Sequence, residues 1–185
     1  MSVTTYYTAT SLDGFIADAA HSLDWLLRQD HDPSGPLNHD HFLADIGAVV
    51  MGSTTYEWVV RHEPGVWPYR LPTWVMTSRE LPTVDGDVRF ARGDIRPVHE
   101  EMAAAARGRG LWIVGGGDLA GQFADAGLLD EVIVAIAPVT LGGGAPLLPR
   151  TLDLELRELD RNRAFACARY AVVRPDADAA PSASG

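Results

Sequence analysis

Three consecutive glycines, Gly115, Gly116 and Gly117, constrain this chain more than any other feature. They follow a short apolar run at residues 111–114, and a helical pattern starts at residue 118. The spacing predicts a strand, a turn where a ligand can approach the backbone closely, and a helix N-terminus. Such a terminus favours an anion, which indicates a phosphate-binding loop and hence a nucleotide site. A tight strand-to-helix turn without a ligand explains the spacing equally well.

Other apolar runs have the length and composition of strands, at residues 3–10, 46–51, 73–77, 88–91 and 131–137. Helical patterns stand between them at residues 38–45, 53–61, 99–107 and 118–126. Residues 152–160 and 164–173 alternate apolar and polar side chains, which predicts an antiparallel pair joined near residues 161–163. This order predicts a three-layer α/β fold with a mixed, mostly parallel sheet, helices on both faces and an antiparallel C-terminal edge.

Length and composition fit one domain with a sizeable core: 185 residues, 46% hydrophobic and 22% charged. We expect this domain to span residues 1–174, and the small, polar residues 175–185 to be disordered. The formal net charge of −10 argues against nucleic acid and anionic membranes as partners. The N-terminus lacks a signal-peptide pattern and no apolar stretch has the length of a membrane span, so we expect a cytoplasmic protein.

The residue inventory excludes several kinds of chemistry. Every basic residue is an arginine, so neither a Schiff-base lysine nor a Walker-type phosphate lysine is available. The single cysteine, Cys167, permits no disulfide within the chain and is predicted to be a small buried residue. His31, His39 and His41 lie near acidic residues, but their spacing matches no metal-binding signature, and we expect no metal.

Two further junctions resemble the glycine turn. Gly52 ends a buried run, and Ser53, Thr54 and Thr55 then offer hydroxyl and N–H groups to a phosphate, although helix capping explains these residues as well. A third run ends at residues 77–79, where serine and arginine suit a ribose or its phosphate and a polar loop is the alternative. Open α/β sheets bind ligands at the carboxyl ends of their strands, so the three junctions together favour a nucleotide site. The glycine spacing and its late position differ from a Rossmann fingerprint.

Several segments, taken in order, resemble the dihydrofolate reductase-like superfamily, in the branch that contains the reductase domain of bacterial riboflavin biosynthesis. The matching segments are SLDGFIA at residues 11–17, LDW at 23–25, VMGSTTYE at 50–57, TSR at 77–79, IVGGG at 113–117 and APVTLGGGAPL at 137–147. They cover nearly all of the expected domain. Because residue 1 lies close to the first strand, we expect a stand-alone reductase without the zinc deaminase half of bifunctional enzymes.

The resemblance implies a reductase that binds NADPH across the carboxyl edge of the sheet. The residues it places at the phosphates are Gly52, Ser53, Thr54, Thr55, Gly115, Gly116, Gly117, Asp118 and Leu119. It places Thr77, Ser78 and Arg79 at the adenosine ribose, and Ala9 and Ile16 beside the nicotinamide. Dihydrofolate reductases often carry an arginine directly after Met-Gly, where this chain has Ser53. NADH is therefore the alternative cofactor, and Arg79 remains the candidate for a 2′-phosphate contact.

Hydride transfer also needs an oriented acceptor and a source of protons. The candidates for orientation or proton supply are Asp13, Asp24 and Tyr56, although Asp13 also suits a turn and Asp24 a helix cap. The candidates for substrate contact are Trp25, Thr140, Gly142 and Gly143. Trp25 is favoured as cover for the core over a stacking platform, and the glycines also suit a plain flexible turn.

The sequence thus predicts an NADPH-dependent reductase of a small heterocyclic substrate, similar to the 5-amino-6-(5-phosphoribosylamino)uracil reductase of riboflavin biosynthesis. A dihydrofolate or pteridine reductase is less favoured, because the pterin-binding carboxylate has no clear counterpart among Asp32, Asp40 and Asp45. A nucleotide-binding paralogue without catalysis is the alternative from another class. The resemblance further implies a homodimer.

Overall fold

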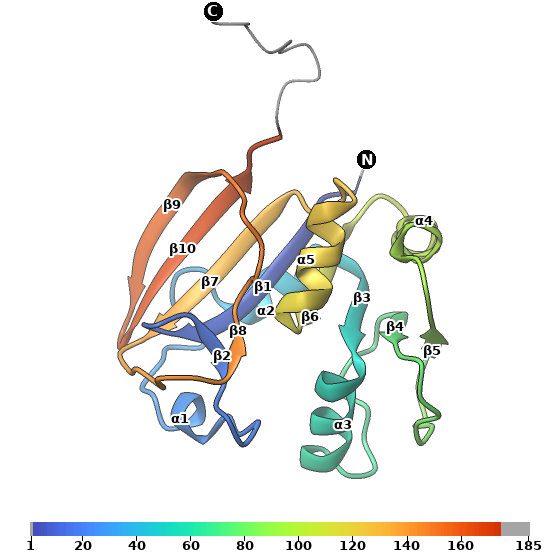
Figure 1. The fold of residues 1–185 in the computed structure, drawn as a ribbon, viewed down its shortest axis with the longest axis horizontal. Coiled ribbons are helices and arrows are strands. Elements are labelled where there is room, and N and C mark those ends of the chain that lie inside the picture. Colours follow the sequence, from blue (N-terminus) through green and yellow to red (C-terminus); the bar gives the residue numbers. More distant parts are fainter. Residues whose placement is uncertain (1, 175–185) are drawn as a thin grey trace, which may run out of the picture.

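The computed structural model of the protein describes residues 2–174. Eight strands form one sheet in the order β5-β4-β3-β6-β1-β7-β10-β9, and β2 pairs with β8 in a second, two-stranded sheet (Figure 1). The strands are β1 (Thr4–Ser11), β2 (Phe15–Ala17), β3 (Ile46–Gly52), β4 (Thr73–Met76), β5 (Val88–Ala91), β6 (Gly110–Gly115), β7 (Glu131–Ala137), β8 (Ala145–Pro146), β9 (Leu154–Asn162) and β10 (Phe165–Val172). The helices are α1 (Asp24–Leu27), α2 (His39–Ala44), α3 (Ser53–His62), α4 (Ile95–Ala106) and α5 (Gly117–Asp125).

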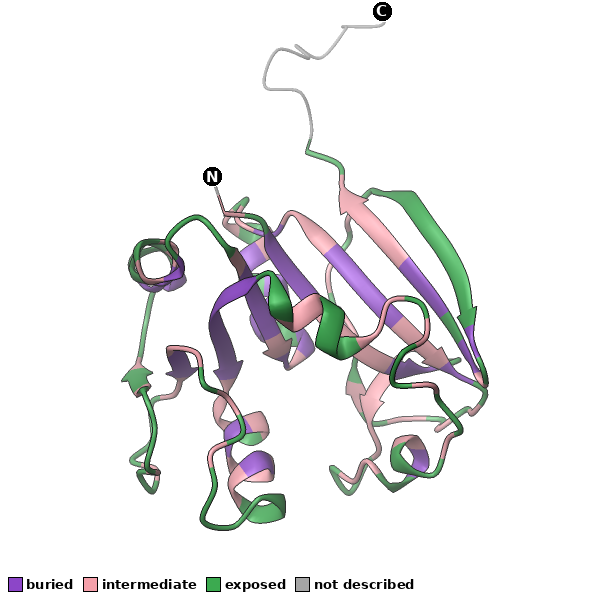
Figure 2. Ribbon diagram, turned by 180° about the vertical axis from the view of Figure 1, so that it is seen from behind, coloured by how far each residue is buried: buried purple, intermediate pink, exposed green. Residues whose placement is uncertain are grey.

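The pairing of the strands confirms the predicted fold class. From β5 to β7 all neighbours in the large sheet are parallel, whereas β10 is antiparallel to both β7 and β9. The parallel strands in the middle of the sheet are buried along most of their length, while β9 at the edge is almost entirely exposed (Figure 2). Strands buried on both faces read as continuous apolar runs, which is why residues 46–51 and 131–137 were recognisable without alternation.

Helices cover both faces of the sheet, as expected. On one face, buried side chains of α4 and α5 pack with Tyr6, Val50 and Ile113 of the sheet. On the other face, residues of α2 and α3 pack with a separate set of strand residues around Trp112. The two faces of the central strands β1, β3, β4 and β6 therefore contribute to two different cores, as the period of two along a strand requires.

Two local details differ from the sequence expectation. The β9–β10 turn falls one residue later, because Asn162 still belongs to β9 and Arg163 takes the left-handed conformation with φ 48°. The short strand β8 was not predicted, since it pairs only with β2 and has no periodic signal of its own. Residues 175–185, expected to be disordered, lie outside the described residues.

The sheet splits open where β1 and β6 diverge. Within the described sheet, β1 pairs with β6 only at Thr4, Thr5 and Tyr6, but with β7 all the way to Ser11. From residue 7 onward, the edge of β1 that faces β6 therefore has no strand paired with it in the described sheet. Backbone groups and side chains at this opening face the region beyond the carboxyl ends of the strands, where open α/β sheets bind ligands. Within residues 2–174, no helix is both long and apolar enough to cross a bilayer.

Candidate active site

A cavity of about 530 Å³ lies at the carboxyl ends of β1, β3 and β6, against the N-termini of α3 and α5. We call it the glycine cavity. Ten of the fourteen residues expected to bind a cofactor line it: Ile16, Gly52, Ser53, Thr54, Thr55, Gly115, Gly116, Gly117, Asp118 and Leu119. The two strand-to-helix junctions, which lie more than 50 residues apart in the sequence, therefore form one site. Figure 1 shows both helices starting at this edge of the sheet.

Both helices begin at a glycine and lack a side-chain cap. Gly52 is the N-cap of α3 and Gly116 is the N-cap of α5, each with an extended backbone and no side-chain hydrogen bond to the first turn. The first N–H groups of a helix have no partner within the helix and need one outside it. Two such termini at one cavity make a site with the partial positive charge that a pyrophosphate would need.

Gly116 and Gly117, the last two of the three consecutive glycines, serve different purposes. A Cβ on Gly117 would lie 2.2 Å from the carbonyl oxygen of Pro146 and 2.3 Å from that of Leu147, so this glycine is required by the close approach of the chain around β8. A Cβ on Gly116 would have as its nearest neighbour Ile16 Cδ1 at 4.0 Å. Gly116 therefore leaves open space at the cavity, which is the property expected of a loop that a ligand approaches.

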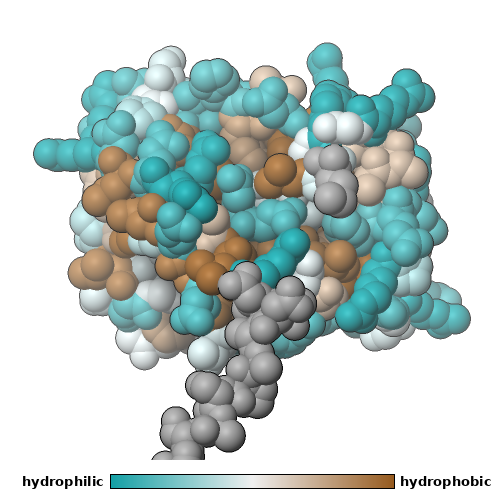
Figure 3. All heavy atoms as spheres, turned by 90° about the horizontal axis from the view of Figure 1, so that it is seen from above, coloured by the Kyte–Doolittle hydropathy of each residue, from teal (hydrophilic) through white to brown (hydrophobic). Residues whose placement is uncertain are grey.

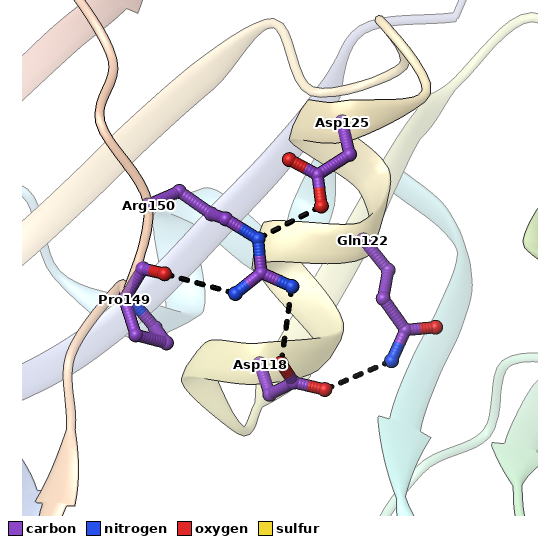
Figure 4. A network of polar contacts seen from close by, with 5 residues as sticks. All are labelled: Asp118, Gln122, Asp125, Pro149 and Arg150. Carbon is purple, nitrogen blue, oxygen red and sulfur yellow. Dashed lines mark hydrogen bonds and ion pairs between the residues drawn. The ribbon is translucent and has the colours of Figure 1, made fainter.

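The carboxylate of Asp118, in the first turn of α5, is held by neighbouring side chains. Arg150 donates to Asp118 at 3.1 Å and to Asp125 at 2.8 Å, and Gln122 donates to Asp118 at 2.9 Å (Figure 4). The hydrogen bonds from Gln122 and Arg150 lower the pKa of Asp118. Arg150 thus balances a negative charge that would otherwise oppose an anion at this helix end.

Several residues of the glycine cavity were not among the site residues expected from the sequence. These are Thr8, Ala17, His21, Leu23, Trp58, Val59, Tyr69, Met76, Val114, Gln122, Ala145 and Pro146. Trp58 could have been found, because it stands one turn after Thr54 on the same face of α3. Tyr69 comes from the loop after α3, which has no periodic pattern. Burial raises the pKa of Tyr69 to about 12, so its hydroxyl keeps its proton at neutral pH.

The residues expected at the adenosine ribose lie outside the lining of the glycine cavity. Thr77 and Arg79 form a turn in which the Thr77 hydroxyl accepts from the Arg79 N–H at 3.0 Å. The Arg79 guanidinium holds Glu57 of α3 in a two-point pair, with N···O distances of 3.2 and 2.7 Å. A 2′-phosphate at Arg79 would therefore compete with a carboxylate that is already in place. Ser78 continues the same exposed turn after β4.

Asp13 ties the turn after β1 to the loop that follows β7. Its carboxylate accepts from the Ser11 hydroxyl at 2.6 Å, from the Leu141 N–H at 3.0 Å and from the Gly142 N–H at 2.7 Å. The hydrogen bond from Ser11 is the main cause that lowers the pKa of Asp13, and the two backbone bonds add to it. Asp13 is thus an ionised acceptor at neutral pH, so these contacts suit orientation of the loop and do not suit proton supply.

The other candidates for catalysis and substrate contact also lie outside the glycine cavity. Tyr56 is fully buried and its hydroxyl donates to the carbonyl of Pro82. Trp25 is buried against Phe165 and Cys167, and its indole N–H donates to the Ser22 carbonyl at 3.2 Å. Asp24 is exposed in the first turn of α1. Thr140, Gly142 and Gly143 belong to the loop that Asp13 holds.

A second cavity, of about 550 Å³, lies on the other side of β1. We call it the acidic cavity, because Asp32 and Asp40 line it. Ala9, expected beside the nicotinamide, lines this cavity, whereas its neighbour Thr8 lines the glycine cavity. Adjacent residues of a strand face opposite sides of the sheet, so β1 itself stands between the two cavities.

A larger hollow of about 750 Å³ lies at the opposite end of the strands, around Val3, Arg109 and Gly110. Figure 3 views the molecule from this end, where hydrophilic and hydrophobic residues are interspersed. Ligands of open α/β sheets bind beyond the carboxyl ends of the strands, so we place the candidate site in the glycine cavity despite its smaller volume. The described residues contain no group of His, Cys, Asp or Glu side chains placed to share a metal ion.

The order of the strands and the glycine-lined strand ends define the dihydrofolate reductase-like fold. A dihydrofolate reductase from Enterococcus faecalis, solved with NADP(H), has this fold, with a TM-score of 0.54 at 17% identity over 92% of this chain and 96% of that chain. Residues 3–169 match the family model described as the RibD C-terminal domain. The chain belongs to this family.

Two relatives are more similar in sequence. The uncharacterized protein YwjB of Bacillus subtilis (strain 168) is 34% identical over 145 residues, which cover 78% of this chain and 81% of YwjB. The crystal structure of a putative riboflavin biosynthesis protein from Shewanella sp. PV-4 has a TM-score of 0.79 at 25% identity, over 93% of this chain and 99% of that chain. Membership of the RibD C-terminal domain family, together with the likeness to the Shewanella protein, supports a riboflavin-pathway reductase-like role.

Proposed function

We propose that the protein is an NAD(P)H-dependent reductase of a small heterocyclic molecule and that it acts in the cytoplasm. The observation that carries the proposal is the meeting of two uncapped, glycine-started helices, α3 and α5, at one cavity beside the end of β1. Membership of a reductase family supports the same function.

The site residues suit a dinucleotide whose pyrophosphate lies at the starts of α3 and α5 and whose nicotinamide lies beside β1. The backbone N–H groups after Gly52 and Gly116 would hold the pyrophosphate, and the hydroxyls of Ser53, Thr54 and Thr55 would add donors. Ile16 and the free edge of β1 near Ala9 would flank the nicotinamide. The bound cofactor supplies a hydride to a C=N or C=O carbon, and the acceptor nitrogen or oxygen takes one proton from solvent or a protein group.

The chain's own residues would prepare this step by positioning and exclusion of water. Asp13 fixes the loop at residues 140–143, in which we place the substrate contacts. Tyr69, whose pKa is raised to about 12, keeps a hydroxyl donor at the glycine cavity at neutral pH. Both effects act by holding groups in place before the acceptor arrives.

For the cofactor we propose NADPH, with Arg79 as the contact for the 2′-phosphate. The guanidinium is about half exposed and lies beside the first turns of α3 through its pair with Glu57. Because the phosphate must displace that carboxylate, we expect the preference for NADPH over NADH to be modest.

We also propose that the protein forms homodimers. The outer strand β9 exposes Leu154, Leu156 and Leu159 with relative exposures of 40%, 51% and 66%. Exposed apolar side chains on an edge strand favour association, which supports pairing of two copies through this strand.

The experiment that tests the reductase proposal combines binding and turnover. NADPH and NADH are titrated into the purified protein, followed by cofactor fluorescence, and oxidation of NADPH is then measured with 5-amino-6-(5-phosphoribosylamino)uracil, its dephosphorylated form and dihydrofolate. Tight dinucleotide binding with turnover of an aminouracil is expected. Stoichiometric binding without any turnover would favour a non-catalytic nucleotide-binding protein, and turnover of dihydrofolate alone would favour a pteridine reductase.

A further inference from the structure

The lining of the glycine cavity has a carboxylate and no arginine or lysine. Of the described residues that line it, none is an arginine, and the chain has no lysine. Asp118, in the first turn of α5, is the one acidic residue among them. Within this lining, a pyrophosphate would meet the partial positive charges of two helix ends and the full negative charge of one carboxylate. The affinity for the anion therefore depends on how the charge of Asp118 is compensated.

The compensating charge comes from Arg150, which lies outside the lining, in the loop after β8. Among the ion pairs of residues 2–174, only the pair of Arg150 and Asp118 includes a lining residue. Arg150 donates to Asp118 at 3.1 Å, and its Nε donates to Asp125 at 2.8 Å (Figure 4). Its third nitrogen donates to the Pro149 carbonyl at 2.9 Å. The guanidinium thus braces α5 from its first turn to its last residue, and all three nitrogens have acceptors.

The helix surface is shaped to receive this side chain. A Cβ on Gly121 would lie 2.9 Å from Arg150 Cγ and 3.0 Å from Arg150 Cζ. A residue other than glycine at position 121 would therefore displace the arginine from the helix. The Arg150 side chain is only 28% exposed, in contrast to a freely solvated surface arginine. The brace is thus part of the packing between α5 and the chain that follows β8.

Both oxygens of the Asp118 carboxylate are engaged. One accepts from Arg150, and the other accepts from the Gln122 amide at 2.9 Å. Gln122 is neutral, so it fixes the direction of the carboxylate without changing the net charge. The bonds from Gln122 and Arg150 lower the pKa of Asp118, so this carboxyl group stays ionised at neutral pH. Since Asp118 keeps its charge, only a cation can cancel it.

We propose that Arg150 is a positioning residue for the phosphate site of the glycine cavity: it holds the Asp118 carboxylate and cancels the charge that would repel a pyrophosphate. The proposal rests on the proposed reductase function and deepens it, because it names what sets the affinity at the pyrophosphate. NADPH and NADH carry the same pyrophosphate. The contribution of Arg150 is therefore equal for the two cofactors, unlike that of Arg79.

The test removes the charge of Arg150 first and that of Asp118 second. NADPH and NADH are titrated into the full chain in about 0.1 M salt, followed by cofactor fluorescence. Arg150→Gln should weaken the binding of both about fivefold, the effect of one unit charge about 4 Å from another in water. Adding Asp118→Asn should return the affinity to within about twofold of the parent, whereas a loss caused by distortion of α5 would persist. The loss in Arg150→Gln should also shrink in about 1 M salt, where charges are screened over about 3 Å.

The matched control adds Asp125→Asn to Arg150→Gln, because Asp125 is the other carboxylate bonded to the same guanidinium. Asp125 is the last residue of α5, about 10 Å along the helix from Asp118, so this change should not restore binding. Asp118→Asn alone leaves Arg150 paired with Asp125 and should bind both cofactors at least as tightly as the parent. This single variant tests the proposal even where Arg150→Gln does not fold.

Four results would overturn the proposal: unchanged affinity in Arg150→Gln, a loss that Asp118→Asn does not repair, equal repair by Asp125→Asn, or weaker binding by Asp118→Asn alone. Inorganic pyrophosphate is titrated into the same proteins by calorimetry. If pyrophosphate shows the expected pattern and neither dinucleotide binds, the reductase function is refuted and the role of Arg150 stands. If the parent binds none of the three compounds, both proposals are refuted.

Discussion

Replacing Gly116 with valine tests whether this glycine is needed for ligand binding or for the stability of the fold. The Gly116 backbone has φ −87° and ψ 173°, an extended conformation that valine adopts readily. The nearest atom to an added Cβ is Ile16 Cδ1 at 4.0 Å, an ordinary van der Waals distance. The free energy of unfolding should therefore change by no more than about 1 kcal/mol, with a small gain from the stiffer unfolded chain.

Cofactor affinity should respond far more strongly. The valine side chain would fill the space through which a pyrophosphate approaches the first N–H groups of α5. Loss of one hydrogen bond to a charged group costs about 1.5–3 kcal/mol, which weakens NADPH binding by about ten- to a hundredfold. Thermal denaturation followed by circular dichroism measures the first effect, and titration of NADPH fluorescence measures the second. A Gly116→Val protein that folds normally and binds NADPH as tightly as the parent refutes the phosphate loop.

The neighbouring variant Gly117→Ala is the matched control, and the opposite pattern is expected for it. Its Cβ would lie 2.2 Å from the Pro146 carbonyl oxygen, so the chain around β8 must move. Overpacking of this kind costs about 1–3 kcal/mol, which should appear as a lower melting temperature. An unchanged melting temperature would show that the contact between Gly117 and β8 is absent in solution.

Two further predictions concern polar contacts. Arg79→Ala should weaken NADPH binding about tenfold and NADH binding little, because only NADPH carries the 2′-phosphate. Glu57→Gln should strengthen NADPH binding, because it frees the Arg79 guanidinium. Titrations in which Arg79→Ala weakens the binding of both cofactors equally would show that Arg79 does not contact the 2′-phosphate. Asp13 has a lowered pKa in the fold, so its hold on the loop is fully present above the ordinary aspartate pKa and is lost as the pH falls through the lowered value. The Gly142 amide resonance should follow this titration in NMR spectra and exchange faster with solvent in Asp13→Asn; a resonance that ignores both changes contradicts the contact.

The parts of the fold that could be predicted are those with strong local signals. Residues 131–137 form β7 with the expected bounds, because a strand buried on both faces reads as a continuous apolar run. The glycine turns were found from local spacing as well. The reason why a position requires glycine can depend on segments distant in the sequence. Gly117 is required because the chain around β8 packs against it, and the sequence did not predict β8.

Predictions of catalytic or substrate-binding roles that relied on residue type alone were less informative than those based on local spacing. Tyr56 and Trp25 have side chains able to do chemistry, yet both are buried and bonded to backbone carbonyls. Asp13 was weighed between a turn and a catalytic role, and its partners come from a loop more than 120 residues away. The acidic cavity combines residues of β1, β10 and the segment around Asp32, and no spacing in the sequence brings these together. Tertiary contacts decide such roles, and periodicity and capping carry no information about them.

A crystal structure of the protein with NADPH decides most directly where the dinucleotide binds. We predict the pyrophosphate between the first turns of α3 and α5, within hydrogen-bond distance of the backbone after Gly52 and Gly116, and the nicotinamide at the opening between β1 and β6. A pyrophosphate bound elsewhere, such as in the hollow around Arg109, would contradict the proposed reductase site.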